Sequence, residues 1–302
     1  MPPTECSQIP HQVREHFHAF RFEGARLLET NQHRICVWHL SEDPLVLLAK
    51  SGLDLPLVSN CLSLRRKLFD VEAPVGPPLV PPAPDPIQCN NRIWWLDRYL
   101  GKPEDSLTPE RITQAGRAIR QFHDAAHSLG ETNIPETFRR PCRFGNDFPW
   151  SGNFFAPLCN LPDDKSAIVA QVRQRIAEHS FQSAFQQSPL TLNHGDLKPT
   201  NILWGTEPGP ILIDFEESRR GHAVWDLGFF CSEYLMGQLR KDRMERDGGA
   251  VFKALCEGYG PTPWIDGDPS FGITMALLPT VYRFRDDPNE PRWAELAREL
   301  LI

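Results

Sequence analysis

Seven prolines crowd into residues 74–86 and divide the 302-residue chain into two unlike parts. Proline fixes its own φ angle and has no backbone N–H, so this stretch cannot form a helix or a central strand. The residues on its two sides must therefore form their helices and strands separately. A chain of this length is expected to fold into two compact units or into one domain with two lobes.

The part before the prolines has the pattern of a small antiparallel sheet. Short segments rich in aliphatic, aromatic and β-branched residues, separated by polar turns, cover residues 19–28, 34–40 and 45–50. One helix is expected at 59–69, and a further strand at 92–100 follows the prolines. We predict that residues 1–96 form a small β-rich lobe.

The remaining residues, 97–302, are predicted to form a larger and mainly helical lobe. Its clearest helix follows Thr108, a good N-cap residue, and carries apolar side chains three and four positions apart until Gly130. Further helices are expected at 166–179, 225–240, 250–259, 271–285 and 289–301, and strands at 190–192, 202–204 and 211–215. The predicted fold class is α+β, with a cleft between the two lobes.

Composition and charge exclude several classes of partner. The chain has 32 basic and 39 acidic residues, a net charge of −7 and no basic tail, which argues against nucleic-acid binding. No apolar stretch approaches the length of a membrane-spanning helix, and the first residues lack the pattern of a secretion signal, so no membrane partner is expected. Eight scattered cysteines without a Cys-x-x-Cys pair favour reduced thiols and a cytoplasmic location. The oligomeric state cannot be inferred.

Two histidines, His123 and His127, have the i, i+4 spacing of a zinc site on a helix. They lack the intervening glutamate of a hydrolytic zinc motif, so packing or surface roles are favoured for both.

The residues best suited to carry chemistry lie at 193–216. Asp196 and Asn201 are five positions apart on a loop that Pro199 stiffens, and Asp214 ends the partner strand of the same predicted hairpin. Because a hairpin places strand ends side by side, we expect these three side chains to converge. Oxygen ligands of this kind suit Mg²⁺, which keeps coordination positions open for phosphate. The pattern therefore favours phosphoryl transfer, in which a protein mainly positions groups and neutralises charge.

The same residues resemble a known family. The run His194-Gly-Asp-x-x-x-x-Asn201, followed by Ile213-Asp-Phe-Glu216 and Trp225-Asp-Leu227, resembles the aminoglycoside phosphotransferase and choline kinase-like family, which shares the bilobal protein-kinase fold. Residues 196–201 also resemble the catalytic loop of serine/threonine protein kinases, but His-Gly in place of His-Arg favours the small-molecule branch. The resemblance is specific over about residues 193–230 and weak in the first 90 residues.

This resemblance implies roles for the polar residues of the loop and hairpin. Asp196 would orient the hydroxyl group of the acceptor and take its proton, and Lys198 would contact the γ-phosphate of the nucleotide. Asn201 and Asp214 would hold Mg²⁺ against the β- and γ-phosphates. Asp226 would brace the catalytic loop, with capping of its own helix as the alternative.

The resemblance also implies a nucleotide site in the small lobe. Lys50, at the end of an apolar strand, would pair with the α- and β-phosphates. The segment Leu96-Asp-Arg-Tyr-Leu100 would be the hinge whose backbone recognises adenine, through Leu96, Arg98 and Tyr99. ATP is the expected phosphoryl donor, with GTP as an alternative.

Two features of the kinase pattern are missing. The first 60 residues contain only Gly24 and Gly52 and no glycine-rich phosphate loop, so a turn at residues 31–33 would have to cover the phosphates. The predicted helix at 59–69 offers no acid to pair with Lys50, which leaves Asp54, Asp70 and Glu72 as candidates. These absences keep a non-catalytic kinase-like binding protein open as an alternative. A regulatory protein kinase is a second one.

The acceptor is predicted only as a class, namely a metabolite, amino alcohol, sugar or aminoglycoside. Acidic side chains on the large lobe would favour an amine-bearing acceptor. Aromatic side chains that could stack on it, with core packing as the alternative, are Phe144, Phe148, Trp150, Phe154 and Phe155.

Overall fold

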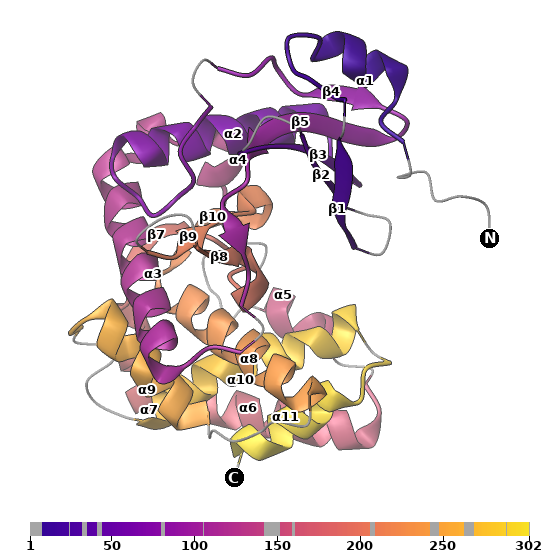
Figure 1. The fold of residues 1–302 in the computed structure, drawn as a ribbon. Coiled ribbons are helices and arrows are strands. Elements are labelled where there is room, and N and C mark those ends of the chain that lie inside the picture. Colours follow the sequence, from indigo (N-terminus) through magenta and orange to yellow (C-terminus); the bar gives the residue numbers. More distant parts are fainter. Residues whose placement is uncertain are drawn as a thin grey trace.

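A computed structural model describes residues 8–23, 25–31, 35–40, 44–79, 82–104, 106–141, 152–158, 161–205, 209–241, 248–262, 269–287 and 289–301. These residues form a small β-rich lobe at one end and a larger helical lobe at the other (Figure 1). The predicted α+β class with two unequal lobes is confirmed.

The small lobe is built on a five-stranded antiparallel sheet in the order β1-β2-β3-β5-β4. Its elements are α1 (His11–His16), β1 (Arg26–Asn31), β2 (Ile35–His39), β3 (Leu45–Ser51), α2 (Leu55–Asp70), β4 (Ile87–Cys89) and β5 (Arg92–Arg98). The helix α2 begins at an N-cap, because the carboxylate of Asp54 accepts a hydrogen bond from Leu57 N at 2.7 Å. Asp54 is therefore engaged away from Lys50.

The helical lobe is assembled around α3, α8, α9 and α10, which pack against one another. Its helices are α3 (Pro109–Leu129), α4 (Glu136–Arg139), α5 (Gly152–Phe155), α6 (Asp163–Ala177), α7 (His179–Gln187), α8 (Val224–Arg240), α9 (Gly248–Tyr259), α10 (Pro269–Asp286) and α11 (Arg292–Leu301). Short 3-10 turns occur at η1 (Glu131–Asn133), η2 (Ala156–Leu158), η3 (Pro199–Asn201) and η4 (Phe215–Glu217). The helix α3 begins at Pro109 after the Thr108 cap, as its sequence predicts.

Two small sheets lie between the main sheet and the helices (Figure 1). Their strands are β6 (Gly101–Lys102), β7 (Leu190–Asn193), β8 (Ile202–Gly205), β9 (Ile211–Leu212) and β10 (Arg219–His222), paired as β6-β8-β9 and β10-β7. The proline-rich segment reaches this region, because Leu212 N donates to Pro74 O at 2.8 Å and Val75 bridges Leu212. The segment thus links the small lobe to the hairpin.

Several short elements escape the sequence prediction, among them α1, β4, α4, α5, α7 and β10. The strand β4 follows Pro86 directly and pairs with β5 at the edge of the sheet, and an edge strand of this kind tolerates neighbouring prolines. The expectation of reduced thiols is wrong at Cys36, which is disulfide-bonded, whereas Cys61, Cys89, Cys231 and Cys256 are free thiols. Within the described part of the chain, no helix combines the length and apolar character needed to cross a bilayer.

Candidate active site

The strand pairs β7/β10 and β8/β9 bring two loops together. Asn193, at the end of β7, pairs with Arg219 at the start of β10, and Ile202 of β8 pairs with Leu212 of β9. One further backbone bond, from Ile213 N to Asn201 O at 3.1 Å, sets the residue before Asp214 against Asn201. The loop after β7 and the turn after β9 therefore lie side by side, as the predicted hairpin requires.

Asp196 and Asn201 are joined directly within the first loop. The side-chain amide nitrogen of Asn201 donates to Asp196 O at 2.8 Å and to Asp196 Oδ2 at 3.2 Å. Lys198 Nζ also contacts Asp196 Oδ2, at 2.7 Å. Because the Asn201 nitrogen is used in these bonds, its oxygen is the atom left to act as a ligand. The structure thus brings Asp196, Lys198 and Asn201 into one cluster.

The buried carboxylate of Asp226, in α8, holds this loop by accepting hydrogen bonds from its backbone. Its Oδ2 accepts from His194 N at 2.7 Å, and its Oδ1 accepts from Gly195 N at 3.0 Å. Asp226 therefore has the bracing position and not the cap position, because the N-cap of α8 is Ala223 and both Asp226 oxygens accept from the loop. His123 Nε2 lies 3.0 Å from the same Oδ2, and His123 Nδ1 lies 2.9 Å from the Tyr259 hydroxyl. His123 is therefore a buried scaffold residue.

Gly195 is required by the shape of this loop. Its φ of +83° lies in the left-handed region, and a Cβ atom there would overlap the carbonyl oxygen of Glu217. The neighbouring His194 is buried, and its Nε2 contacts Ile213 O at 2.7 Å. The His-Gly pair thus locks the loop onto the turn that carries Asp214.

Asp214 follows β9 in the left-handed conformation, with a φ of +70° that is unusual for a residue other than glycine. This conformation turns its carboxylate toward Lys50 of β3, whose ammonium lies 2.9 Å from Asp214 Oδ1 and 2.6 Å from Glu216 Oε2. The link spans 164 residues and joins the small lobe to the metal-binding turn predicted from the sequence. Lys50 therefore reaches the cluster from the small lobe.

Burial and charge act in opposite directions on these two carboxylates. Burial raises the pKa of Asp214, but the Lys50 ammonium outweighs it, so that the pKa lies below its usual value. Burial and the Asp214 charge raise the pKa of Glu216 to about 7 despite Lys50. For Lys50, burial lowers the pKa, and the two carboxylates outweigh it and raise the pKa above the usual value. Asp214 is thus the more acidic of the two carboxylates, and Glu216 is mostly ionised only above about pH 7.

The predicted hinge residues do not join this cluster through any side-chain bond that the structure describes. Leu96 lies inside β5 opposite Leu47, with its side chain buried in the small-lobe core. Arg98 N donates to Asp97 Oδ1 at 2.8 Å, and Tyr99 N donates to Pro44 O at 2.6 Å, so both of these donors are already used. Because Tyr99 and Pro44 are a hydrogen-bonded pair, the alternation of an antiparallel ladder turns the backbone groups of Leu96 away from β3. Adenine recognition at the hinge stays a prediction.

Comparison with known proteins identifies the family of this chain. The sequence model of the phosphotransferase enzyme family matches residues 80–269, which include both loops of the cluster. The chain belongs to this family. It is therefore a phosphotransferase, and the resemblance noted from its motifs is confirmed. None of the curated proteins with which this phosphotransferase was compared matches it.

Solved structures confirm the bilobal, protein-kinase-like fold of the phosphotransferase. The amicoumacin kinase hAmiN, in complex with AMP-PNP, Ca²⁺ and Ami, is 12% identical over 97% of this chain and 93% of its own, with a TM-score of 0.62. Spectinomycin phosphotransferase APH(9)-Ia, with ADP and spectinomycin, is 15% identical over 98% and 94%, with a TM-score of 0.54. A choline/ethanolamine kinase family protein from Mesorhizobium loti is 15% identical over 98% and 91%, with a TM-score of 0.55.

Sequence reasoning missed two contacts of the phosphotransferase. Glu216 pairs with Lys50, and Arg65 of α2 pairs with Asp97 of β5 at 2.5 Å. The absence of an acid from the helix at 59–69 was the signal that another element had to supply one. Asp70 and Glu72, the remaining candidates, are exposed at the far end of α2.

Two further expectations concern the phosphate cover and the acceptor site. Residues 32–34 and 142–151 lie outside the described residues, so the predicted turn at 31–33 and the aromatic positions 144, 148 and 150 are not described. Phe154 and Phe155 belong to the hydrophobic core, and Phe154 stacks on Tyr282 at 5.7 Å. For Phe154 and Phe155, the structure therefore supports the alternative of core packing.

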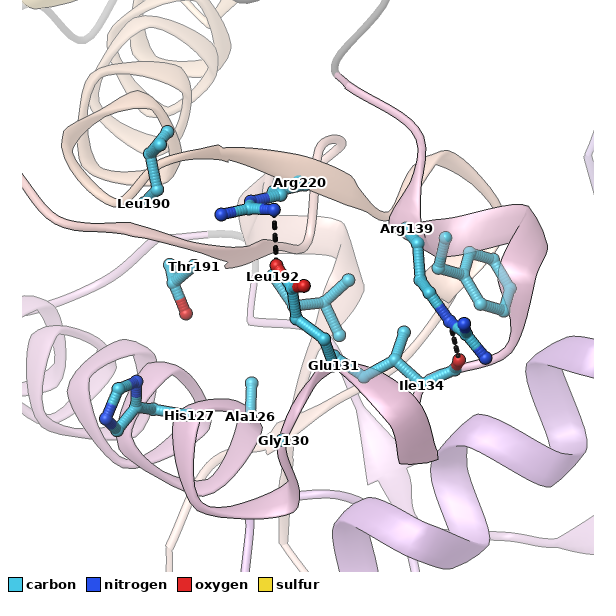
Figure 2. A pocket seen from close by; sticks show the side chains of 11 residues that line it. Ala126, His127, Gly130, Glu131, Ile134, Arg139, Leu190, Thr191, Leu192 and Arg220 are labelled. Carbon is cyan, nitrogen blue, oxygen red and sulfur yellow. Dashed lines mark hydrogen bonds and ion pairs between the residues drawn. The ribbon is translucent and has the colours of Figure 1, made fainter.

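A cavity of about 270 Å³ lies elsewhere on the large lobe (Figure 2). Its lining joins the end of α3 to α4 and to the β7/β10 pair, with Arg220 and Glu131 forming an ion pair over it. None of the cluster residues lines this cavity. It is separate from the candidate active site.

Proposed function

We propose that this phosphotransferase transfers the γ-phosphoryl group of ATP to a hydroxyl group of a small molecule. The observation that carries the proposal is the joint placement of Asp196, Asn201 and Asp214. Two backbone-paired loops hold them, and the Asn201 amide is oriented by Asp196. In the reaction, the acceptor oxygen bonds to the γ-phosphorus while the bond from that phosphorus to the β,γ-bridging oxygen breaks. ADP leaves, and the hydroxyl proton passes to a base.

Asp196 is the proposed base. Its carboxylate is held by Lys198 and Asn201 and remains partly exposed, with 22% of the side chain accessible, so an acceptor hydroxyl can approach it. A loose transition state requires little deprotonation before the phosphoryl group moves, so orienting the hydroxyl is the larger contribution of Asp196. Lys198, 2.7 Å from Asp196, is placed to contact the γ-phosphate.

Asn201 and Asp214 are the proposed Mg²⁺ ligands, and their chemistry fits this ion. Asn201 offers a side-chain oxygen because its nitrogen is bonded elsewhere, and Asp214 offers a carboxylate kept ionised by Lys50. Mg²⁺ takes one or two such groups together with substrate phosphates and water. When bound, Mg²⁺ would neutralise charge on the β- and γ-phosphates. Within the described residues, no group of three His, Cys, Asp or Glu side chains forms a competing metal site.

The nucleotide is proposed to lie between residues 1–96 and residues 97–302. Lys50 would contact the α- and β-phosphates, and Leu96, Arg98 and Tyr99 would line the adenine site. Of these three, Leu96 has its backbone N–H and C=O groups turned away from β3. It lies two residues beyond Trp94, where the pairing of β5 with β4 ends. GTP is the alternative donor, and the proposal places the reaction in the cytoplasm, which supplies both nucleotides and Mg²⁺.

The acceptor class is proposed from the fold and the neighbours. Two of the neighbours are a spectinomycin phosphotransferase and an amicoumacin kinase, and a third belongs to the choline/ethanolamine kinase family. All these names refer to small molecules or amino alcohols. We therefore propose a metabolite, amino alcohol, sugar or aminoglycoside as the acceptor.

The test is a screen of these acceptor classes, together with amino acids, for acceptor-stimulated release of ADP or GDP. With an acceptor that is active in this screen, Asp196→Ala should lower kcat by roughly 10²-fold or more, while the affinity for the nucleotide changes little. Label passing from γ-labelled ATP to protein instead would favour a protein kinase. No Mg²⁺-ATP-dependent thermal shift and no ATP hydrolysis in the wild type would favour a binding protein and refute the proposal.

A further inference from the structure

Among the described residues, the ammonium of Lys50 has two carboxylate partners, and both come from the turn after β9. Asp214 Oδ1 lies 2.9 Å and Glu216 Oε2 lies 2.6 Å from Nζ. Only 16% of the Lys50 side chain is accessible. A buried ammonium on a flexible four-carbon stem needs a fixed anion to hold one position.

The helix α2 packs against η4, the 3-10 turn that carries Glu216, but it presents no acid to Lys50. Cys61 of α2 is half-buried and lies close enough to Lys50, Asp214 and Glu216 for their charges to act on its thiol. Burial, followed by the nearby charges of Glu216 and Asp214, raises the pKa of its thiol to about 12. A neutral thiol therefore stands close to Lys50 on the helix side.

One turn further along the same face of α2, Arg65 contacts Asp97 of β5 at 2.5 Å. The Asp97 carboxylate also accepts from Arg98 N at 2.8 Å. The helix is thus fastened to the sheet through Arg65, without an ion pair to Lys50. Its place in the small lobe does not depend on the lysine.

We propose that Glu216 is the positioning residue for Lys50, and that it fixes the ammonium for the nucleotide phosphates from the turn after β9 instead of from α2. This inference rests on the proposed function. If Asp214 turns to the divalent ion, Glu216 is the carboxylate that stays with Lys50 among the described residues. The backbone of Glu216 is held in place by Arg219 Nη1, which donates to Glu216 O at 3.3 Å.

The test moves the negative charge from Glu216 to α2. Calorimetry at pH 8 measures the affinity of the Mg²⁺–AMP-PNP complex for the wild type and for Glu216→Gln. It also compares two double variants, Cys61→Glu/Glu216→Gln and its uncharged match Cys61→Gln/Glu216→Gln. Asp70→Asn, an exposed acid at the end of α2, is the control and should bind as the wild type does. Thermal melting confirms that each variant is folded.

Glu216→Gln should bind the complex about tenfold more weakly, since about 1.4 kcal/mol corresponds to one factor of ten. The charged double variant should bind at least about fivefold more tightly than the uncharged one, because the carboxylate at position 61 faces the same ammonium. This comparison between the double variants stands even where Glu216→Gln alone does not fold.

Two results would overturn the inference alone, provided that the wild type binds the nucleotide. The first is an affinity of Glu216→Gln equal to that of the wild type. The second is equal affinity of the two double variants. A wild type that binds no nucleotide at all would instead overturn the proposed function, and this inference with it. The two failures are therefore distinguishable from the wild-type measurement.

Discussion

The carboxylate of Asp226 should be the most costly single side chain of the site to remove. It is fully buried and accepts hydrogen bonds from the backbone of His194 and Gly195, and it also contacts His123 Nε2. A buried donor left without an acceptor costs about 1–3 kcal/mol. Asp226→Asn keeps one acceptor oxygen but places its NH₂ group against the other backbone donor, which should lower the free energy of unfolding by about 2 kcal/mol. Asp226→Ala leaves both backbone donors unpaired, which should lower it by about 4 kcal/mol or more.

Urea and thermal unfolding of the two variants measure these losses. For a chain of 302 residues, with about 2.1 cal/mol/K of unfolding entropy per residue, 4 kcal/mol should lower Tm by roughly 6 °C. Asp164→Asn is the matched control, because Asp164 pairs with Arg298 at 3.0 Å in solvent, where such a pair contributes at most about 1 kcal/mol. If Asp226→Ala unfolds within about 1 kcal/mol of the wild type, the bracing role is refuted.

Three further outcomes are expected. Gly195→Ala should lower turnover and also lower the free energy of unfolding by about 1–3 kcal/mol, because Gly195 has a positive φ and an added Cβ atom would overlap Glu217 O. An unchanged melting temperature would contradict this. Asp214→Asn should remove the Mg²⁺ dependence of AMP-PNP binding measured by calorimetry, and a retained dependence would place the ion elsewhere. Burial lowers the pKa of His222 below 6.5, so the unfolded chain binds the proton more readily, and stability should fall as pH drops from about 6.5 through the lower folded pKa. In His222→Gln this part of the pH dependence of urea unfolding should disappear, and an identical pH slope would contradict the assignment.

The parts of the fold predicted well from the sequence are those in which a strong local signal decides the structure. The Thr108 cap with Pro109 fixes the start of α3, and the long apolar pattern after it carries the helix to Leu129. The elements missed, such as α7 (His179–Gln187), are short or adjoin another element, so that tertiary packing decides them.

The same division holds for the site. Asp196, Asn201 and Asp214 lie within nineteen residues of one hairpin, so their spacing predicts that they meet. Glu216, one of the two partners of Lys50, is 166 residues away in the chain, and the packing of the small lobe on the turn after β9 brings it close. A search for an acid within the helix at 59–69 could not have found it, because the helix supplies Cys61 at that place.

The most direct test of the site is a crystal structure of the phosphotransferase with Mn²⁺ and AMP-PNP, with the ion located by its anomalous signal. The predicted result is a peak about 2.0–2.3 Å from both Asn201 Oδ1 and the Asp214 carboxylate, in contact with the nucleotide phosphates. A bound nucleotide whose ion lies away from these two side chains would contradict the assignment.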